Sequence, residues 1–410
     1  MSLPNLSSQI SDRATSIDVS GIRKVFDLGA TLSDPINLSI GQPDFPVPDS
    51  IKDAAKQAID HNHNGYTLTQ GVLPLIQRIA EHLKADLAWP DNVGERDSDT
   101  PIIVTSGTSG ALYLMMQALL NPGDEIIIPD PYFVPYPSMA ELAGARPVLC
   151  DTYPDFRMTA DRIEPLITEH TKAVLLNSPS NPAGVVLTQH ECKEVLELCR
   201  SKNVLLISDE IYDEFCFEDH REAFPTPADS QLPETRCPSP CREPGAHEDV
   251  LLIRGFGKTY GCTGWRLGYI AGPAPIVNAI RKLQQYTFVC PPAPLQHAMI
   301  AALDLDMTGL VAEYADRRDE VLQTLGQLGA ELGEDHLAPT PGGAFYLFVK
   351  VPERLSMTGQ QFFEHLVQEN ILTIPGNVFS SRDTHIRLSI AAPPEKLSSG
   401  IEQIAAAMRA

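Results

Sequence analysis

The chain has 410 residues, more than one ordinary domain needs, and its 43% hydrophobic and 20% charged residues are typical of a globular protein. Its 53 acidic and 31 basic side chains give a formal net charge of -22, which argues against nucleic acid and anionic membranes as partners. No apolar run is long enough to cross a bilayer, and residues 1–20 lack the apolar stretch of a signal peptide. We therefore expect a cytoplasmic protein with at least two domains.

The first predicted element is an amphipathic helix that begins near residue 50. Ser50 and Asp53 have the spacing of a capping box, which satisfies free backbone N–H groups at a helix start. Apolar residues then recur at helical spacing. They are Ile51, Ala54, Ala55, Ala58 and Ile59.

A series of short apolar runs follows, and segments with helical patterns separate many of them. The predicted strands are 102–105, 125–128, 147–150, 173–176, 204–208, 251–253 and 268–271. Strands that alternate with helices predict a parallel sheet, and nearly continuous apolarity indicates a sheet covered on both faces. The fold class predicted from this pattern is α/β.

Residues 224–249 interrupt this alternation with proline, glycine and charged residues, and we predict a surface insertion there. Cys237, Cys241 and His247 lie within it and leave a metal site open as an alternative. A proline-rich loop is favoured, because structural zinc usually needs four ligands. The eight cysteines of the chain are dispersed, and we expect free thiols.

Beyond residue 291 the pattern changes to longer helical segments. Strand patterns start at Gly342 and cover residues 385–390. This change predicts a second domain of the α+β type.

Small residues connect the strand at 102–105 to an apolar helix that we expect to begin near Ala111. Such a junction presents free N–H groups and the positive end of a helix dipole. Gly107, Thr108 and Ser109 are therefore candidates for holding a phosphate, although ordinary turn chemistry also explains small residues there.

Lys258 follows the strand at 251–253 within the sequence RGFGK. A lysine at the end of a buried strand is poorly solvated, and burial near other cations lowers an amine pKa toward nucleophilic use. Residues 258–269, KTYGCTGWRLGY, resemble the lysine-containing signature of class I and II aminotransferases. The resemblance extends to 41–45, 177–184, 208–212 and 387–389, and is closest to the aspartate and aromatic aminotransferases of bacteria and archaea.

The resemblance implies fold type I of the pyridoxal-phosphate-dependent transferases. A large cofactor domain with a mostly parallel seven-stranded sheet would span 48–291, and a smaller domain would combine 1–47 with 292–410. The expected assembly is a homodimer in which Tyr66 reaches the neighbouring active site.

The resemblance also implies the cofactor, pyridoxal 5′-phosphate, and roles for individual residues. Lys258 would hold the cofactor as a Schiff base and move a proton between the substrate Cα and the cofactor. Asp209 would pair with the pyridine nitrogen, Asn181 and Tyr212 would bind the phenolic oxygen, and Phe133 would stack on the ring. Taken singly, each of these four is more often a capping, turn or core residue.

The phosphate would be held by Arg266 and Tyr66 together with the turn at residues 107–109. Gly255 departs from the family pattern, because many members have a phosphate-binding serine at this position.

The substrate would be bound by Arg387, which grips the α-carboxylate, with Asn181 and the loop at Gly41. On its own, an arginine in a strand more often pairs with a surface acid.

The predicted reaction is ping-pong transamination from an L-amino acid, with aspartate or an aromatic amino acid favoured, to a 2-oxo acid, with 2-oxoglutarate favoured. A C-S β-lyase on the same fold would need the same Lys258, Asp209 and Arg387. A non-catalytic regulatory member is a remote alternative, since such proteins usually lose the lysine or add a DNA-binding segment.

Overall fold

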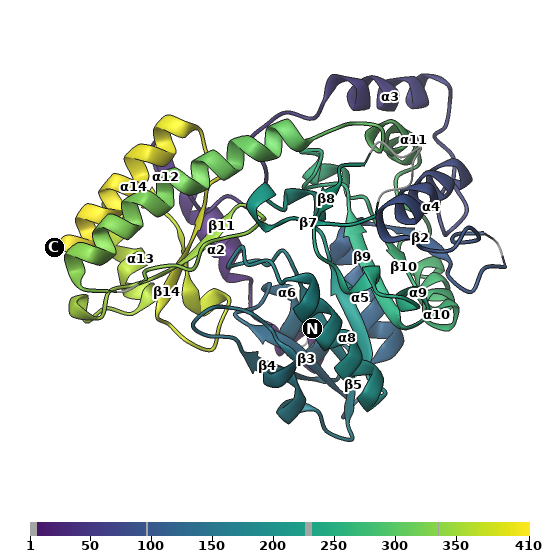
Figure 1. Cartoon of the computed structure of the whole chain (residues 1–410), viewed down its shortest axis with the longest axis horizontal. Helices are drawn as coiled ribbons and strands as arrows, with labels where there is room; N and C mark the ends of the chain where they lie inside the picture. The colour runs from purple at the N-terminus through teal and green to yellow at the C-terminus, as the bar shows by residue number, and fades with distance from the viewer. Residues whose placement is uncertain (1–5, 96, 226–231, 335) are drawn as a thin grey trace, which may run out of the picture.

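The computed structural model describes residues 6–95, 97–225, 232–334 and 336–410 (Figure 1). Its largest sheet has seven strands in the order β2-β10-β9-β6-β5-β3-β4. Their bounds are β2 Ile102–Thr105, β3 Glu125–Asp130, β4 Arg146–Asp151, β5 Thr171–Asn177, β6 Leu205–Asp209, β9 Val250–Gly255 and β10 Gly268–Ala271. Strand β10 runs antiparallel to both neighbours, and the other pairs run parallel. The predicted strands and the α/β class are confirmed.

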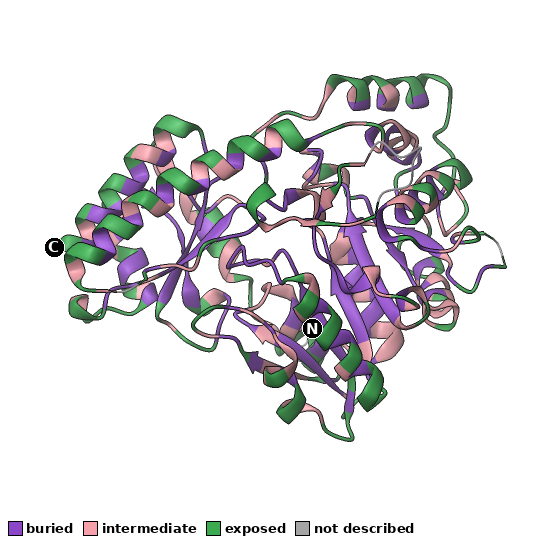
Figure 2. Cartoon of the chain, in the orientation of Figure 1, coloured by how far each residue is buried: buried purple, intermediate pink, exposed green. Residues whose placement is uncertain are grey.

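Helices cover both faces of this sheet, because successive side chains of each strand point to opposite sides. In β9, Leu252 packs into one hydrophobic cluster, whereas Leu251 and Ile253 pack into another. The first cluster includes side chains of α4 Leu73–Leu87, α8 Gln189–Lys202 and α11 Ala293–Ala302. The second includes side chains of α5 Gly107–Leu119, α6 Pro135–Leu142 and α10 Ala274–Gln285. Figure 2 shows the strands buried between helices whose outer faces are exposed.

A three-stranded antiparallel sheet lies beside the large one and has the order β11-β14-β13. Its elements are β11 Tyr346–Lys350, β13 Ile374–Pro375 and β14 His385–Ser389, with α12 Thr308–Leu332, α13 Gly359–Gln368 and α14 Pro394–Arg409 around them (Figure 1). Near the N-terminus, β1 Ile36–Asn37 pairs in parallel with β12 Ile371–Leu372. The two ends of the chain therefore pack together, and the domain limits at 48 and 291 stay a prediction.

The remaining elements are short or lie at the edges. They are α1 Asp12–Thr15, α2 Gly21–Gly29, α3 Asp49–Asp60, α7 Ala160–Ile163, α9 Ala246–Asp249, β7 Glu222–Ala223 and β8 Thr235–Arg236. Single 3-10 turns are η1 Leu6–Gln9, η2 Glu164–Leu166, η3 Asp213–Phe215, η4 Glu218–His220, η5 Pro240–Arg242, η6 Thr263–Trp265, η7 Glu353–Leu355 and η8 Gly376–Val378. No helix of the described residues is long and apolar enough to span a membrane.

The predicted capping box is wrong, although the helix itself is present. Helix α3 begins at Asp49 with Pro48 as its N-cap, and no side chain caps it. Ser50 lies inside the first turn, so it is too far along the helix to act as the cap. Helix α5 likewise begins at Gly107 rather than near Ala111, because the small residues themselves form its first turn.

The predicted surface insertion at 224–249 is wrong for residues 236–241, which are buried. Cys241 is fully buried, and its carbonyl accepts a 2.9 Å hydrogen bond from Trp89 Nε1. Arg242 is paired with Asp86 at 2.8 Å. Arg236 and Arg242 of this segment thus find a partner inside the protein, and residues 226–231 lie outside the described part. All eight cysteines are free, and no group of three or more potential metal ligands occurs among the described residues.

Candidate functional site

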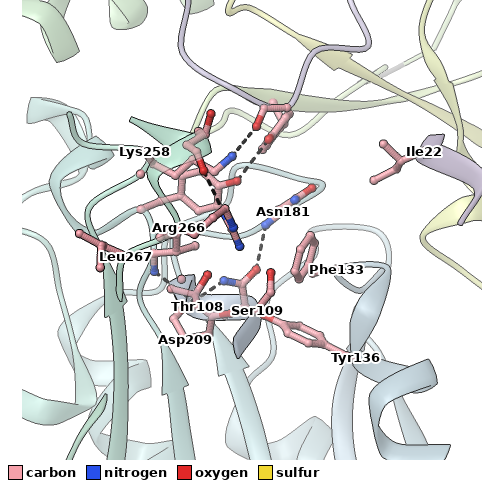
Figure 3. Close-up of a pocket in the computed structure, with 18 of the residues that line it drawn as sticks. Ile22, Thr108, Ser109, Phe133, Tyr136, Asn181, Asp209, Lys258, Arg266 and Leu267 are labelled. Atoms are coloured by element: carbon pink, nitrogen blue, oxygen red, sulfur yellow. Dashed lines mark hydrogen bonds between the residues drawn. The ribbon is translucent and has the colours of Figure 1, made fainter. Parts of the chain in front are cut away.

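A cavity of about 280 Å³ lies between the two sheets (Figure 3). Its lining includes every predicted cofactor and substrate residue except Tyr66. Those residues are Gly41, Gly107, Thr108, Ser109, Phe133, Asn181, Asp209, Tyr212, Lys258, Arg266 and Arg387. The structure therefore brings these predicted residues together around one cavity, and their roles stay a prediction.

The fold explains why these residues meet. Asp209 ends β6, Lys258 follows the end of β9, and α5 begins just after β2. The carboxyl ends of parallel strands lie at one edge of a sheet, where ligands of α/β proteins usually bind. Arg387 faces this edge from β14, in the smaller sheet.

Lys258 lies under the loop at Gly41, and its Nζ donates a hydrogen bond to the Gly41 carbonyl oxygen. Nζ also lies 5.8 Å from the ring centroid of Tyr212. Loss of solvent, together with the positive charges of Arg387 and Arg266, lowers the pKa of the Lys258 amine to about 7. At neutral pH a large share of this amine is therefore uncharged and nucleophilic.

Asp209 lines the cavity and is buried, with 2% of its surface exposed. Its Oδ2 accepts a 2.7 Å hydrogen bond from the Tyr136 hydroxyl, and its Oδ1 accepts one of 3.3 Å from the Ile211 amide. Burial raises the pKa of this carboxyl to about 6, which leaves it mostly ionised at pH 7. A buried carboxylate without a cationic partner suits a protonated ring nitrogen.

Arg387 is buried, with 1% of its surface exposed. Its Nη1 donates to Asn181 Oδ1 and its Nη2 to the Ser39 carbonyl oxygen, each at 3.0 Å, while Nε has no partner. Its guanidinium lies 4.3 Å from the ring centroid of Tyr346 and 4.7 Å from that of Phe379. Within the described chain Arg387 forms no ion pair with a carboxylate, so the surface pairing considered from the sequence does not occur. This cation is available for a planar anion in the cavity.

Arg266 and the start of α5 define a second anion position. A Cβ at Gly107, where φ is +69°, would lie 2.6 Å from Arg266 Nη2, so only glycine lets the guanidinium approach the backbone. Gly255 has no room for a side chain either, because a Cβ would lie 2.6 Å from Ile211 Cδ1 and 2.8 Å from Thr108 Cγ2. This close packing leaves no room at position 255 for the serine side chain that the resemblance led us to expect.

Tyr212, Tyr346 and Asn181 line the same cavity as the two anion positions. The hydroxyls of Tyr212 and Tyr346 are 3.2 Å apart, and burial raises the pKa of Tyr212 well above its usual range. The Asn181 amide donates to Asn177 Oδ1 at 2.9 Å. Neutral hydroxyl and amide donors at this place suit an oxyanion.

Eight lining residues were not predicted as site residues, and Tyr136, Tyr346 and Ile22 are three of them. Tyr136 belongs to the same aromatic run as Phe133, and Tyr346 lies in the predicted strand that starts at Gly342, so both could have been considered. Ile22 comes from α2 and points toward the cavity from the other side (Figure 3). No sequence pattern singles it out.

Tyr66 lies outside this cavity and is 90% exposed. It lines a separate groove of about 400 Å³ together with Leu73 and His297. Its expected reach into a neighbouring subunit stays a prediction.

The residues of the cavity fit pyridoxal phosphate. The glycine cradle at Arg266 offers a place for the phosphate, and Asp209 lies where a protonated ring nitrogen would be stabilised. Lys258 supplies an amine for the aldehyde, and the unpaired Arg387 Nε remains for a substrate carboxylate.

Comparisons with known proteins agree with this chemistry. Residues 33–404 match the family described as aminotransferase class I and II. The chain is 33% identical to an aspartate aminotransferase of Pyrococcus abyssi, with 98% of each chain covered. It is 31% identical to aromatic-amino-acid aminotransferase 2 of Thermococcus litoralis, over 96% of this chain and 97% of the relative. A solved aspartate aminotransferase from Thermus thermophilus, with maleate, has a TM-score of 0.85 at 30% identity and covers 97% of this chain and 99% of its own.

Proposed function

The chain belongs to the aminotransferase class I and II family, and we propose that it transfers the amino group of an aspartate or aromatic L-amino acid to 2-oxoglutarate by a ping-pong mechanism. It is an enzyme that depends on pyridoxal phosphate, as members of this family do. The proposed residue roles follow from the contacts within the cavity.

The observation that carries the proposal is that Lys258 and Arg387 line the same cavity. Arg387 keeps a buried, unpaired Nε, so an incoming amino acid can neutralise it through its α-carboxylate. A substrate held in this way places its Cα near the lysine that must move the proton.

Bound pyridoxal phosphate supplies the aldehyde that accepts the amino group and a ring that withdraws electrons from the substrate Cα. Lys258, with its pKa lowered to about 7, is proposed to move a proton between the substrate Cα and the cofactor. Asp209 is proposed to keep the ring nitrogen protonated through its carboxylate. Arg387 and Asn181 are proposed to orient the substrate, and the Gly41 loop to exclude water above Lys258.

The part of the cavity that one subunit supplies supports an aromatic donor rather than aspartate. Among the lining residues that the structure describes, the only cations are Lys258, Arg266 and Arg387, and each has a proposed partner. The second carboxylate of aspartate would find no further cation, whereas a ring would meet Ile22 and Tyr346. The proposed acceptor, 2-oxoglutarate, also has a second carboxylate, so a test of acceptors should include pyruvate.

A discontinuous assay tests the proposal. The protein loaded with cofactor is incubated with each amino acid and each 2-oxo acid, and the new amino acid and new 2-oxo acid are quantified. We expect equal amounts of the two products with phenylalanine or tyrosine as donor, and none with Lys258→Ala. Ammonia and pyruvate released from cystathionine without an added 2-oxo acid would instead support a C-S β-lyase. Absence of cofactor binding would leave the regulatory alternative.

We also propose that the protein acts as a homodimer in the cytoplasm. Exposed apolar residues that line the Tyr66 groove support an interface there, including Leu68 and Leu73. In such a dimer Tyr66 would contribute to the phosphate site of the neighbouring subunit.

A further inference from the structure

Tyr136 makes a contact in the active-site cavity that the predicted mechanism leaves without a role. It is the second residue of α6 and is fully buried. Its hydroxyl donates a 2.7 Å hydrogen bond to Asp209 Oδ2, across 73 residues of sequence. Among the described residues, no other side chain donates a hydrogen bond to the Asp209 carboxylate, and none forms an ion pair with it. The Asn177 amide donates only to the Asp209 backbone carbonyl, at 3.0 Å.

The charge of Asp209 depends on few neighbours. Burial opposes its ionised form, and the adjacent Glu210 adds a like charge. The Tyr136 hydroxyl and the Ile211 amide favour the ionised form, and burial raises the pKa of Tyr136 itself well above its usual range. Tyr212 also interacts electrostatically with Tyr136 and Asp209, and burial raises the pKa of Tyr212 too. The Tyr136 hydroxyl therefore remains neutral, and able to donate its proton in a hydrogen bond, over the whole pH range in which Asp209 titrates.

The ring of Tyr136 makes a second contact that bears on the cofactor. It meets the Phe133 ring edge to face, with centroids 5.5 Å apart and planes at 82°. Figure 3 shows the two rings as neighbours on one side of the cavity. The same side chain thus fixes the carboxylate at the ring nitrogen position and the aromatic ring proposed to stack on the cofactor.

We infer that Tyr136 is a positioning residue that holds the Asp209 carboxylate in its charged form and in the orientation that receives the cofactor's ring nitrogen. This inference rests on the proposed function, since it assumes that the ring nitrogen of pyridoxal phosphate lies at Asp209. If Tyr136 only filled the core, its ring would matter and its hydroxyl would not.

The test replaces the hydroxyl and keeps the ring. Tyr136→Phe should raise the dissociation constant for pyridoxal phosphate by about tenfold, which is typical for loss of a hydrogen bond to a charged group. In the cofactor-free protein, the Asp209 carboxyl should titrate at higher pH, measured by its ¹³C chemical shift and assigned with Asp209→Asn. Tyr153→Phe is the matched control, because it removes a partly buried hydroxyl that bonds Ser380 at 2.9 Å, outside the cavity.

A double-mutant cycle separates this role from general packing. In the Asp209→Asn background, Tyr136→Phe should change the dissociation constant by less than about twofold, because the charge that it supports is gone. An equal loss in both backgrounds would overturn the inference, as would an unchanged dissociation constant and titration in the single variant. Failure of the unaltered protein to bind pyridoxal phosphate would instead contradict the proposed function.

A measurement on the unaltered chain covers the case in which Tyr136→Phe does not fold. Uniform incorporation of 3-fluorotyrosine makes the tyrosine hydroxyls stronger donors. The Asp209 titration should then move to lower pH, and an unmoved or raised titration would contradict the inference.

Discussion

Lys258 has the most consequential pKa shift at the scale of single residues. Because the pKa of its amine is lowered to about 7, the nucleophilic form grows as the pH rises through 7 and is nearly complete one to two units above. The rate at which the cofactor-free protein captures pyridoxal phosphate should therefore level off above about pH 8. Stopped-flow absorbance across this range measures it. A rate that keeps rising toward pH 10 would indicate an ordinary, solvated lysine.

Arg387 should control substrate binding rather than the stability of the cofactor site. Arg387→Gln removes a forked donor that neither Asn181 nor Ser39 can replace, and we expect kcat/KM for the amino acid to fall by about 100-fold. The dissociation constant of pyridoxal phosphate should stay within about threefold. Arg382→Gln, which removes an arginine paired with Asp151 at the surface, serves as the control. Equal kinetics for the two variants would exclude the assigned role.

At the scale of elements, a buried ion network connects β6, β9 and α4. Arg254 is 3% exposed and pairs with Glu210 at 2.8 Å, Asp86 at 2.9 Å and Asp213 at 3.1 Å. Arg254→Met would leave these acids without their shared cation, which costs about 3–5 kcal/mol in buried pairs. The exposed pair of Arg200 and Asp249 is the comparison, since Arg200→Met should cost less than about 1 kcal/mol.

Unfolding of both cofactor-free variants in urea measures the difference. A loss for Arg254→Met no larger than that for Arg200→Met would show that the buried network contributes little to stability. Arg254 lies in β9, and Lys258 lies just after this strand, so a change at Arg254 could also displace the lysine. Both variants should therefore also be tested for cofactor binding.

The strands of the large sheet could be predicted from the sequence, whereas the burial of residues 236–241 could not. The strands of the large sheet each contain a short apolar run, so a local pattern was enough. Residues 236–241 were wrongly predicted to lie at the surface, because the proline and charged residues of segment 224–249 are typical of a solvent-exposed loop. Arg242 is instead paired with Asp86, 156 residues away, and a charge pair across that distance leaves no local pattern. The predicted N-cap of α3 was wrong for a local reason, because Pro48 occupies the N-cap position that was expected for Ser50.

At the scale of the whole molecule, the cavity is assembled from both sheets. Residues in recognisable segments, such as Lys258 and Asp209, could be predicted, and they line the cavity as expected. Tyr136 and Tyr346 were missed because their importance depends on partners 73 and 134 residues away. Ile22 was missed because a single apolar residue of α2 carries no chemical signature.

The proposed dimer is tested by charge placed on the exposed apolar groove. Leu73 is 57% exposed at the rim of the Tyr66 groove, so Leu73→Glu should be tolerated by an isolated chain and should disfavour a partner. Light scattering should give about twice 44.8 kDa for the unaltered protein and a smaller average mass for the variant. Leu6→Glu, another exposed apolar position, is the control. Identical dimers for all three proteins would place the interface elsewhere.

The central claim is that Lys258 binds pyridoxal phosphate for amino-group transfer. The most direct measurement is the absorbance spectrum of the protein with pyridoxal phosphate, for the unaltered chain and Lys258→Ala. We expect a visible band that requires Lys258, disappears when an amino acid donor is added, and returns when the donor is removed and a 2-oxo acid is supplied. A spectrum identical in both proteins, or a band that no amino acid changes, would contradict it.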